Sequence, residues 1–139
     1  MNVAYFLIPK RDVVWVSIDE SMRHAFQRME QGGFTAIPLL DRAGSYCGTV
    51  TEGDLLRKLM SASGSASPET SDRVKLADVP LRAKITPVDV DANVEQLFER
   101  AIAQNFVPVQ DSRGVFIGIV PRRRIIEHYL GTLRGTPSQ

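Results

Sequence analysis

Residues 37–50 read IPLLDRAGSYCGTV, and residues 107–120 read VPVQDSRGVFIGIV. The two stretches share a proline, an aspartate and two glycines at matching places, with an offset of 70 residues (107 − 37). Each is typical of an apolar strand, a turn that contains Asp and Gly, and a second strand. A repeat of this kind indicates an internal duplication, and the duplication decides the fold class.

The duplication extends upstream, where VSIDESMRHAFQRM from Val16 matches VDVDANVEQLFERA from Val88 with an offset of 72 residues (88 − 16). Apolar residues of both segments recur at i, i+3, i+4 and i+7, which predicts one buried helix face in each copy. Ser21 and Asn93 stand where the N-caps of these helices are expected. Because the offset changes, the second copy has lost two residues between its first helix and the next strand.

Each copy is therefore expected to be a β-α-β-β-α unit, in the α/β (α+β) class, and the two units are expected to pack together because one alone is too small for a good core. The segment SASGSASPETSD from Ser61 is rich in small and polar residues, which is typical of an exposed linker. We expect a first unit at 8–60, a flexible linker at 61–75, a second unit at 76–130 and a frayed tail at 131–139.

The composition limits the classes of function. The chain has 139 residues and a net charge of +1, so no bulk field favours nucleic acid or an anionic membrane. Cys47 is the single cysteine, which excludes a disulfide framework and a cysteine metal site. The apolar run at 3–9 is too short to span a bilayer and lacks the features of a signal peptide, so we expect a cytoplasmic protein.

The sequence contains no catalytic motif. His24 and His128 are the two histidines, and neither belongs to a set of residues with the spacing of a metal site. A nucleophile elbow and a phosphate-binding loop are also absent from the sequence. We therefore expect no catalytic residues, no metal and no cofactor, and we expect that the protein is not an enzyme.

With these motifs the chain resembles a pair of CBS domains, a Bateman module, over roughly residues 8–130. The resemblance lies in Pro-x-x-Asp, then Gly, then Gly-x-x-Thr-x-x-Asp, inside a duplicated β-α-β-β-α pattern. Among CBS pairs, the chain most resembles small stand-alone bacterial proteins that bind cyclic di-AMP, through IPKRDVVWV from Ile8, FTAIP from Phe34 and GIVPRR from Gly118. This resemblance implies two CBS units with pseudo-twofold symmetry and two clefts that take adenine nucleotides.

The first strand-to-helix corner, GTVTEGD from Gly48, matches the ribose-binding motif of CBS proteins. A carboxylate at Asp54 can accept hydrogen bonds from ribose hydroxyls, and the Thr51 hydroxyl can meet a phosphate. The resemblance implies that the other wall of this ribose-type cleft comes from Val88, Asn105 and Phe106. Thr51 and Asp54 are also a good helix start, with Thr as the N-cap, and this structural alternative stays open.

The second corner, GIVPRRR from Gly118, keeps the frame but reverses the charge: Pro121 replaces the threonine, and Arg122, Arg123 and Arg124 follow. Cations at an exposed helix N-terminus cost about 0.3–1 kcal/mol each. A bound polyanion offsets this cost, because charge-assisted hydrogen bonds contribute about 1.5–3 kcal/mol each. The corner is therefore expected to bind phosphate, and the alternative is a solvated helix start in which Glu127 pairs with an arginine.

In the cyclic di-AMP group, the arginines that match Arg122 and Arg123 contact the cyclic dinucleotide. By position, the resemblance implies that the phosphate/adenine cleft is completed by Val14, Phe34 and Thr35, with the Phe34 ring as a stacking face. The chain differs from this group at three positions, which leaves AMP, ADP or ATP in the ribose-type cleft as an alternative: Asp12, Asp54 and Pro121.

The sequence thus favours a stand-alone regulatory protein that binds an adenine nucleotide, with cyclic di-AMP as the first choice, and signals its state to an unidentified target protein. The alternatives are a sensor of AMP, ADP or ATP, a structural dimerisation module without a ligand, and a regulatory fragment of an enzyme on another chain. Stand-alone CBS pairs usually form homodimers, so the resemblance implies a homodimer. Nucleic acid is not an expected partner, because no wider basic stripe accompanies the three arginines.

Overall fold

The computed structural model describes residues 1–63 and 68–133, and the chain divides into two compact units. The first unit comprises Val14–Lys84. The second unit combines Met1–Val13 with the chain from Ile85 onward. The N-terminal 13 residues therefore belong with the second repeat, whereas the expected bounds place residues 8–13 in the first unit.

The first unit has the order β-α-β-β-α, followed by two short helices. Its sheet has the strand order β2-β3-β4, with β2 parallel to β3 and β3 antiparallel to β4. Apolar side chains from the sheet and from α1 and α2 form one buried core. The elements are β2 (Val16–Ser17), α1 (Met22–Gly32), β3 (Ala36–Leu40), β4 (Tyr46–Thr51), α2 (Glu52–Ser63), α3 (Pro68–Arg73) and the 3-10 helix η3 (Leu76–Asp78).

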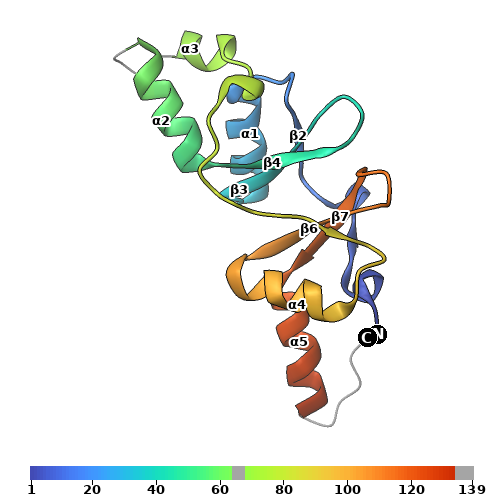
Figure 1. Ribbon diagram of the computed structural model, residues 1–139. Helices are drawn as coiled ribbons and strands as arrows, with labels where there is room; N and C mark the ends of the chain where they lie inside the picture. The colour runs from blue at the N-terminus through green and yellow to red at the C-terminus, as the bar shows by residue number, and fades with distance from the viewer. Residues whose placement is uncertain (64–67, 134–139) are drawn as a thin grey trace. The chain divides into compact units, whose positions relative to one another are not determined.

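The second unit repeats this order, and its sheet gains a strand from the N-terminal segment. The strand order is β1-β7-β6-β5, and the N-terminal segment runs beside β7 (Figure 1). The elements are η1 (Val3–Phe6), β1 (Ile8–Pro9), η2 (Lys10–Asp12), β5 (Val88–Asp89), α4 (Val94–Ala103), β6 (Phe106–Gln110), β7 (Phe116–Pro121) and α5 (Arg122–Leu133). The prediction of an α/β fold with two β-α-β-β-α units is confirmed.

The predicted N-caps of the two equivalent helices are also confirmed. The side chain of Ser21 accepts a hydrogen bond from the backbone N–H of His24 at 3.2 Å. Asn93 does the same for the backbone N–H of Gln96 at 3.0 Å. Both bonds satisfy an amide that has no partner inside its helix, so the repeated local sequence produces the same helix start twice.

The N-terminal strand docks against β7 at a glycine. Pro9 pairs with Gly118, whose φ is +156°, and a Cβ at this glycine would lie 2.1 Å from the carbonyl oxygen of Ile8. No side chain fits at that distance. Gly118 therefore permits the close approach of β1 that builds the fourth strand of the sheet.

The segment expected to be a flexible linker is largely helical where the structure describes it. Residues 61–63 complete α2, and Pro68–Arg73 form α3, with proline at the first helical position as its fixed φ favours. The Asp72 carboxylate accepts a hydrogen bond from Arg23 of α1 at 2.9 Å, and Ser71 is buried. These contacts anchor α3 to the unit. Residues 64–67 and, in the expected tail, residues 134–139 lie outside the described residues.

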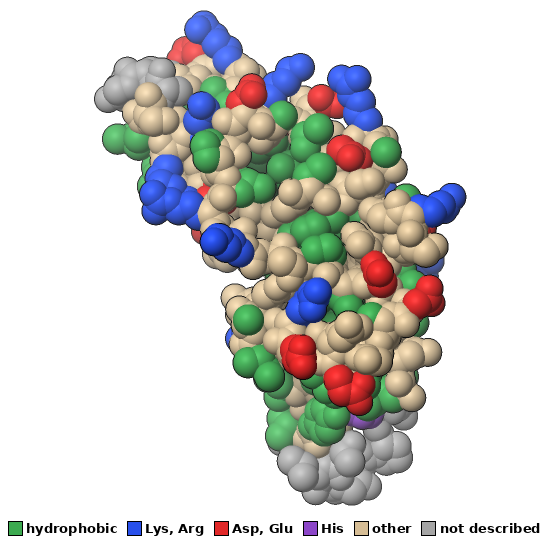
Figure 2. Space-filling view, viewed as in Figure 1, with side chains coloured by type: hydrophobic (Ala, Val, Ile, Leu, Met, Phe, Trp, Pro, Cys, Tyr) green, Lys and Arg blue, Asp and Glu red, His purple; other side chains and the backbone are tan. Residues whose placement is uncertain are grey.

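The visible surface carries charges of both signs. Figure 2 shows Lys and Arg side chains interspersed with Asp and Glu side chains, as the small net charge implies. In the described parts of the chain, no helix is both long and apolar enough to cross a membrane.

Candidate functional site

The backbone of the strand-to-helix corner is the same in both units, although the charges differ. In the second unit β7 ends at Pro121, and the backbone N–H of Arg122 donates to the carbonyl of Asn105 at 2.8 Å. At the equivalent place in the first unit, the N–H of Glu52 donates to the carbonyl of Thr35 at 3.0 Å. The shared backbone bond places the side chains that follow it at matching positions on α2 and α5.

Arg122 caps the C-terminus of α4. Its Nε donates to the carbonyl of Ala101 at 2.6 Å, and its Nη2 donates to the carbonyl of Ile102 at 3.2 Å. The last carbonyls of a helix have no partner within the helix, and the helix dipole favours a cation there. The guanidinium of Arg122 is therefore engaged by backbone carbonyls inside the second unit.

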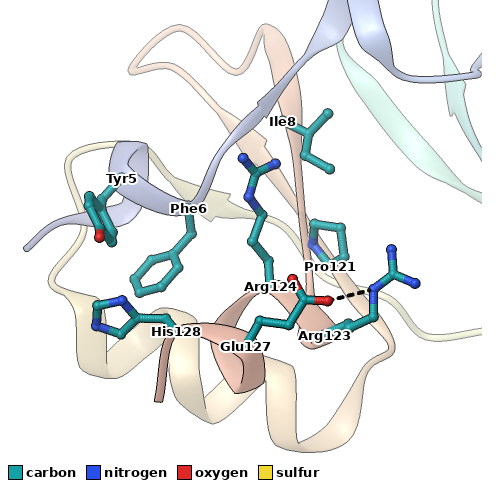
Figure 3. Close-up of a pocket in the computed structure, with 8 residues that line it drawn as sticks. All are labelled: Tyr5, Phe6, Ile8, Pro121, Arg123, Arg124, Glu127 and His128. Carbon is teal, nitrogen blue, oxygen red and sulfur yellow. Dashed lines mark ion pairs between the residues drawn. The ribbon is translucent and has the colours of Figure 1, made fainter. Parts of the chain in front are cut away.

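Arg123 and Arg124 line a cavity of about 320 Å³ within the second unit (Figure 3). One wall comes from η1 and β1, and the other comes from the start of α5. The lining residues are Tyr5, Phe6, Ile8, Pro121, Arg123, Arg124, Glu127 and His128.

The two arginines of this cavity differ in their partners. Arg123 Nε lies 3.3 Å from Glu127 Oε1, and 83% and 64% of the two side chains are exposed. Such an exposed pair contributes only about 0.3–0.5 kcal/mol, so an incoming anion can readily replace it. Arg124 has neither a hydrogen bond nor an ion pair within residues 1–63 and 68–133, and its guanidinium extends toward Ile8 in Figure 3.

These guanidinium groups give the cavity its chemistry. A guanidinium presents several N–H donors in a planar fork, which matches the oxygens of a phosphate or carboxylate. The cavity is at the lower end of the volumes that small-molecule sites occupy. Arg123 and Arg124 together can therefore hold one phosphate group.

An aromatic cluster holds the wall opposite the arginines. The ring of His128 packs edge-to-face against Tyr5 and Phe6, with centroid distances of 5.4 and 5.5 Å. Phe6 is buried and Tyr5 is 47% exposed. Sequence reasoning did not place these three residues at the site, because they reach it through the pairing of β1 with β7. Glu127 did have a visible signal, since it follows Arg123 by one helical turn.

The first corner forms a closed helix start. The N–H of Thr51 donates to Asp54 Oδ2 at 3.0 Å, and the N–H of Asp54 donates to Thr51 Oγ1 at 3.1 Å. Asp54 Oδ1 accepts from the N–H of Arg82 at 3.2 Å and from the Arg57 guanidinium. The Asp54 side chain is buried, and both of its oxygens are occupied. The reciprocal bonds are those of a capping box, the structural alternative for this motif.

The other predicted site residues lie in their own units. In the first unit, Phe34 and Thr35 line a cavity of about 410 Å³, with 46% of Phe34 exposed, and Val14 packs half-buried against the core. The structure thus brings Phe34 together with Thr35, and Arg123 together with Arg124. The predicted wall residues of the ribose-type cleft lie in the second unit. Val88 is buried, Asn105 is exposed and Phe106 is half-buried.

Metal ligands do not gather anywhere in the described chain. Within residues 1–63 and 68–133, no three His, Cys, Asp or Glu side chains come together in a way that could hold a metal ion.

Comparison with known proteins identifies relatives. The family model for the CBS domain matches residues 6–61. The Bacillus subtilis (strain 168) protein named cyclic di-AMP receptor B is 25% identical over 126 residues, which cover 91% of this chain and 84% of the relative.

Solved structures share the fold. The crystal structure of CbpB in complex with c-di-AMP matches with a TM-score of 0.85 and 20% identity, over 97% of this chain and 88% of that chain. The crystal structure of CBSX2 in complex with AMP matches with a TM-score of 0.70 and 23% identity, over 96% and 98%. The architecture of this chain is therefore that of these structures.

Proposed function

We propose that the chain, which matches the CBS-domain family model over residues 6–61 and resembles the bacterial cyclic di-AMP receptor B, is a regulatory protein that binds cyclic di-AMP. The observation that carries the proposal is the cavity with two guanidinium groups, one in a weak exposed ion pair and one without a partner in the described chain. In this proposal Arg123 and Arg124 bind a phosphate of the ligand. In the first unit, the exposed ring of Phe34 lines a cavity with Thr35, and we propose this ring as a stacking face for an adenine.

The test is calorimetric titration with cyclic di-AMP, AMP and ATP. Arg124→Ala is expected to weaken binding of cyclic di-AMP at least tenfold, because a charge-assisted hydrogen bond contributes about 1.5–3 kcal/mol. Arg113→Ala is the matched control, since this arginine has an 81% exposed side chain in the same unit and does not line the cavity. The proposal fails if cyclic di-AMP binds no more tightly than AMP, or if Arg124→Ala binds as the control does.

Sensing of AMP, ADP or ATP through the first corner has less support. A ribose needs free carboxylate oxygens at Asp54, whereas this carboxylate is buried and accepts bonds from Thr51, Arg57 and Arg82. A ribose would have to displace at least one of these donors. We therefore place the phosphate contact at the second corner and not at the first.

We also propose that the protein forms a homodimer through the exposed faces of α2 and α5. Both helices expose large apolar side chains at matching repeat positions: Leu56 (56%) and Met60 (51%) on α2, and Ile126 (48%) and Leu130 (41%) on α5. The duplication has retained these side chains where solvent would favour polar ones, which supports a second copy as their cover. Sedimentation of Ile126→Glu is expected to show monomers, and Gln96→Glu, on the exposed face of α4, is expected to remain dimeric.

Signalling to a target protein completes the proposed function. We propose that another protein reads the bound state, because a ligand acts on a target only where that target distinguishes the bound form from the free form. A target captured from a lysate in the absence of cyclic di-AMP, and released by it, would support this step. Capture that is unchanged by the ligand and by Arg124→Ala would contradict it.

A further inference from the structure

We propose that Glu127 makes the pair of Arg123 and Arg124 selective for phosphodiesters over terminal phosphates. The inference rests on the proposed function at one point, namely that a phosphate of the ligand enters the cavity of the second unit. It adds a residue that determines which kind of phosphate is accepted.

The charges of the cavity carry the inference. Among the described residues that line it, Glu127 is the one acid, and it lies beside two arginines. Its carboxylate is 3.3 Å from Arg123 Nε, and Figure 3 shows it turned toward Arg123, whereas Arg124 extends away toward Ile8. Glu127 therefore occupies part of the space in which a phosphate oxygen would meet Arg123. The two arginines and the one glutamate leave a net charge of +1 for the ligand.

The two classes of phosphate differ in charge. A phosphodiester carries one negative charge, whereas a terminal phosphate carries about −1.5 to −2 at neutral pH. The repulsion from a fixed carboxylate is proportional to the charge of the ligand. The unfavourable free energy of interaction with Glu127 is therefore about twice as large for a terminal phosphate as for a diester. A net charge of +1 matches one diester and leaves a terminal phosphate with uncompensated charge.

Glu127→Gln isolates this effect, because it keeps the size and the helix while it removes the charge. Glu99→Gln is the matched control, since Glu99 is an exposed glutamate on α4 that does not line the cavity. We expect Glu127→Gln to tighten binding about threefold for a singly charged phosphate, as for one screened unit charge. For a doubly charged phosphate the repulsion that is removed is twice as large in free energy, so binding tightens by the square of that factor, about tenfold. The preference for diesters thus falls about threefold, and Glu99→Gln leaves it unchanged.

The experiment titrates wild type and both variants with two pairs of ligands. Cyclic di-AMP and AMP form the nucleotide pair, and dimethyl phosphate and methyl phosphate form the simple pair. The Nε–H NMR signals of Arg123 and Arg124 report occupation of the cavity directly. Urea unfolding of each variant confirms that the fold is retained, since Glu127 is exposed and its ion pair is weak.

The outcomes separate this inference from the proposed function. Loss of diester preference in Glu127→Gln, with both ligand pairs, supports the inference. The same loss with the simple pair, while no variant binds cyclic di-AMP, supports the inference and overturns the proposed function. Tight binding of cyclic di-AMP with an unchanged diester preference in Glu127→Gln overturns the inference alone. If none of the four ligands shifts the arginine signals, both are overturned.

Discussion

Replacement of Arg122 with alanine is expected to destabilise the second unit without abolishing nucleotide binding. The change removes two hydrogen bonds to the C-terminal carbonyls of α4, at Ala101 and Ile102. Hydrogen bonds from a charged group contribute about 1.5–3 kcal/mol where they are shielded, and Arg122 is half-buried. Because water offsets about half of this value at a half-buried site, the two bonds together contribute about 1.5–3 kcal/mol. The loss of a cation from the N-terminus of α5 returns about 0.3–1 kcal/mol. The net expected cost is about 1–2 kcal/mol.

The assay combines global and local measurements of stability. Calorimetry of Arg122→Ala is expected to show Tm lowered by about 4–8 °C. Hydrogen exchange is expected to accelerate at the end of α4, for example at the N–H of Gln104, which donates to the carbonyl of Arg100 at 2.8 Å. Arg113→Ala removes the same charge from an exposed turn of the same unit and is expected to change neither quantity.

Two results would refute this account of Arg122. If Arg122→Ala unfolds like Arg113→Ala, the bonds to the carbonyls do not stabilise α4. If the same variant also loses cyclic di-AMP as completely as Arg124→Ala does, Arg122 is a phosphate ligand, and the sequence-based assignment of all three arginines to the ligand would stand instead.

Three further outcomes are expected. Gly118→Ala should cost about 2–4 kcal/mol, because its φ is strained for alanine and the new Cβ meets the carbonyl of Ile8; urea unfolding measures this. Burial raises the pKa of Tyr46 from 10.0 to about 12. The unfolded state loses this proton at a lower pH than the folded state, so stability falls as pH rises from about 10 to about 12. Tyr46→Phe should remove this part of the fall in unfolding experiments at high pH. Asn93→Ala should cost about 1 kcal/mol through loss of the helix cap, detected by faster exchange of the Gln96 amide.

The repeat made most of the fold predictable from sequence. The matching stretches at 37–50 and 107–120 become β3 with β4 and β6 with β7, in the same register and with an irregularity at the same place in each hairpin. Ser21 and Asn93 act as N-caps as predicted. These features depend on residues close together in the chain, where local propensities and turn chemistry act directly.

The features that sequence reasoning missed depend on contacts between distant segments. The N-terminal strand belongs to the second unit because Ile8 pairs with Ile119 of β7. Arg122 is engaged because the carbonyls at the end of α4 lie within reach of its side chain. Neither partner can be identified from spacing, since each pairing joins separate elements and becomes visible only once the sheet and the helices are assembled.

The proline of the second corner removes the capping box that the first corner has. In the first unit, the Thr51 N–H and hydroxyl complete a capping box with Asp54, so the acid is retained by the fold. Pro121 has neither an N–H nor a hydroxyl, so an acid at position 124 would lack both of these partners. The helix start therefore does not require an acid at position 124, and an arginine can occupy it without an ion-pair partner in the described chain. The loss of the capping role, rather than the number of arginines, is the reason that we propose Arg124 as a ligand contact.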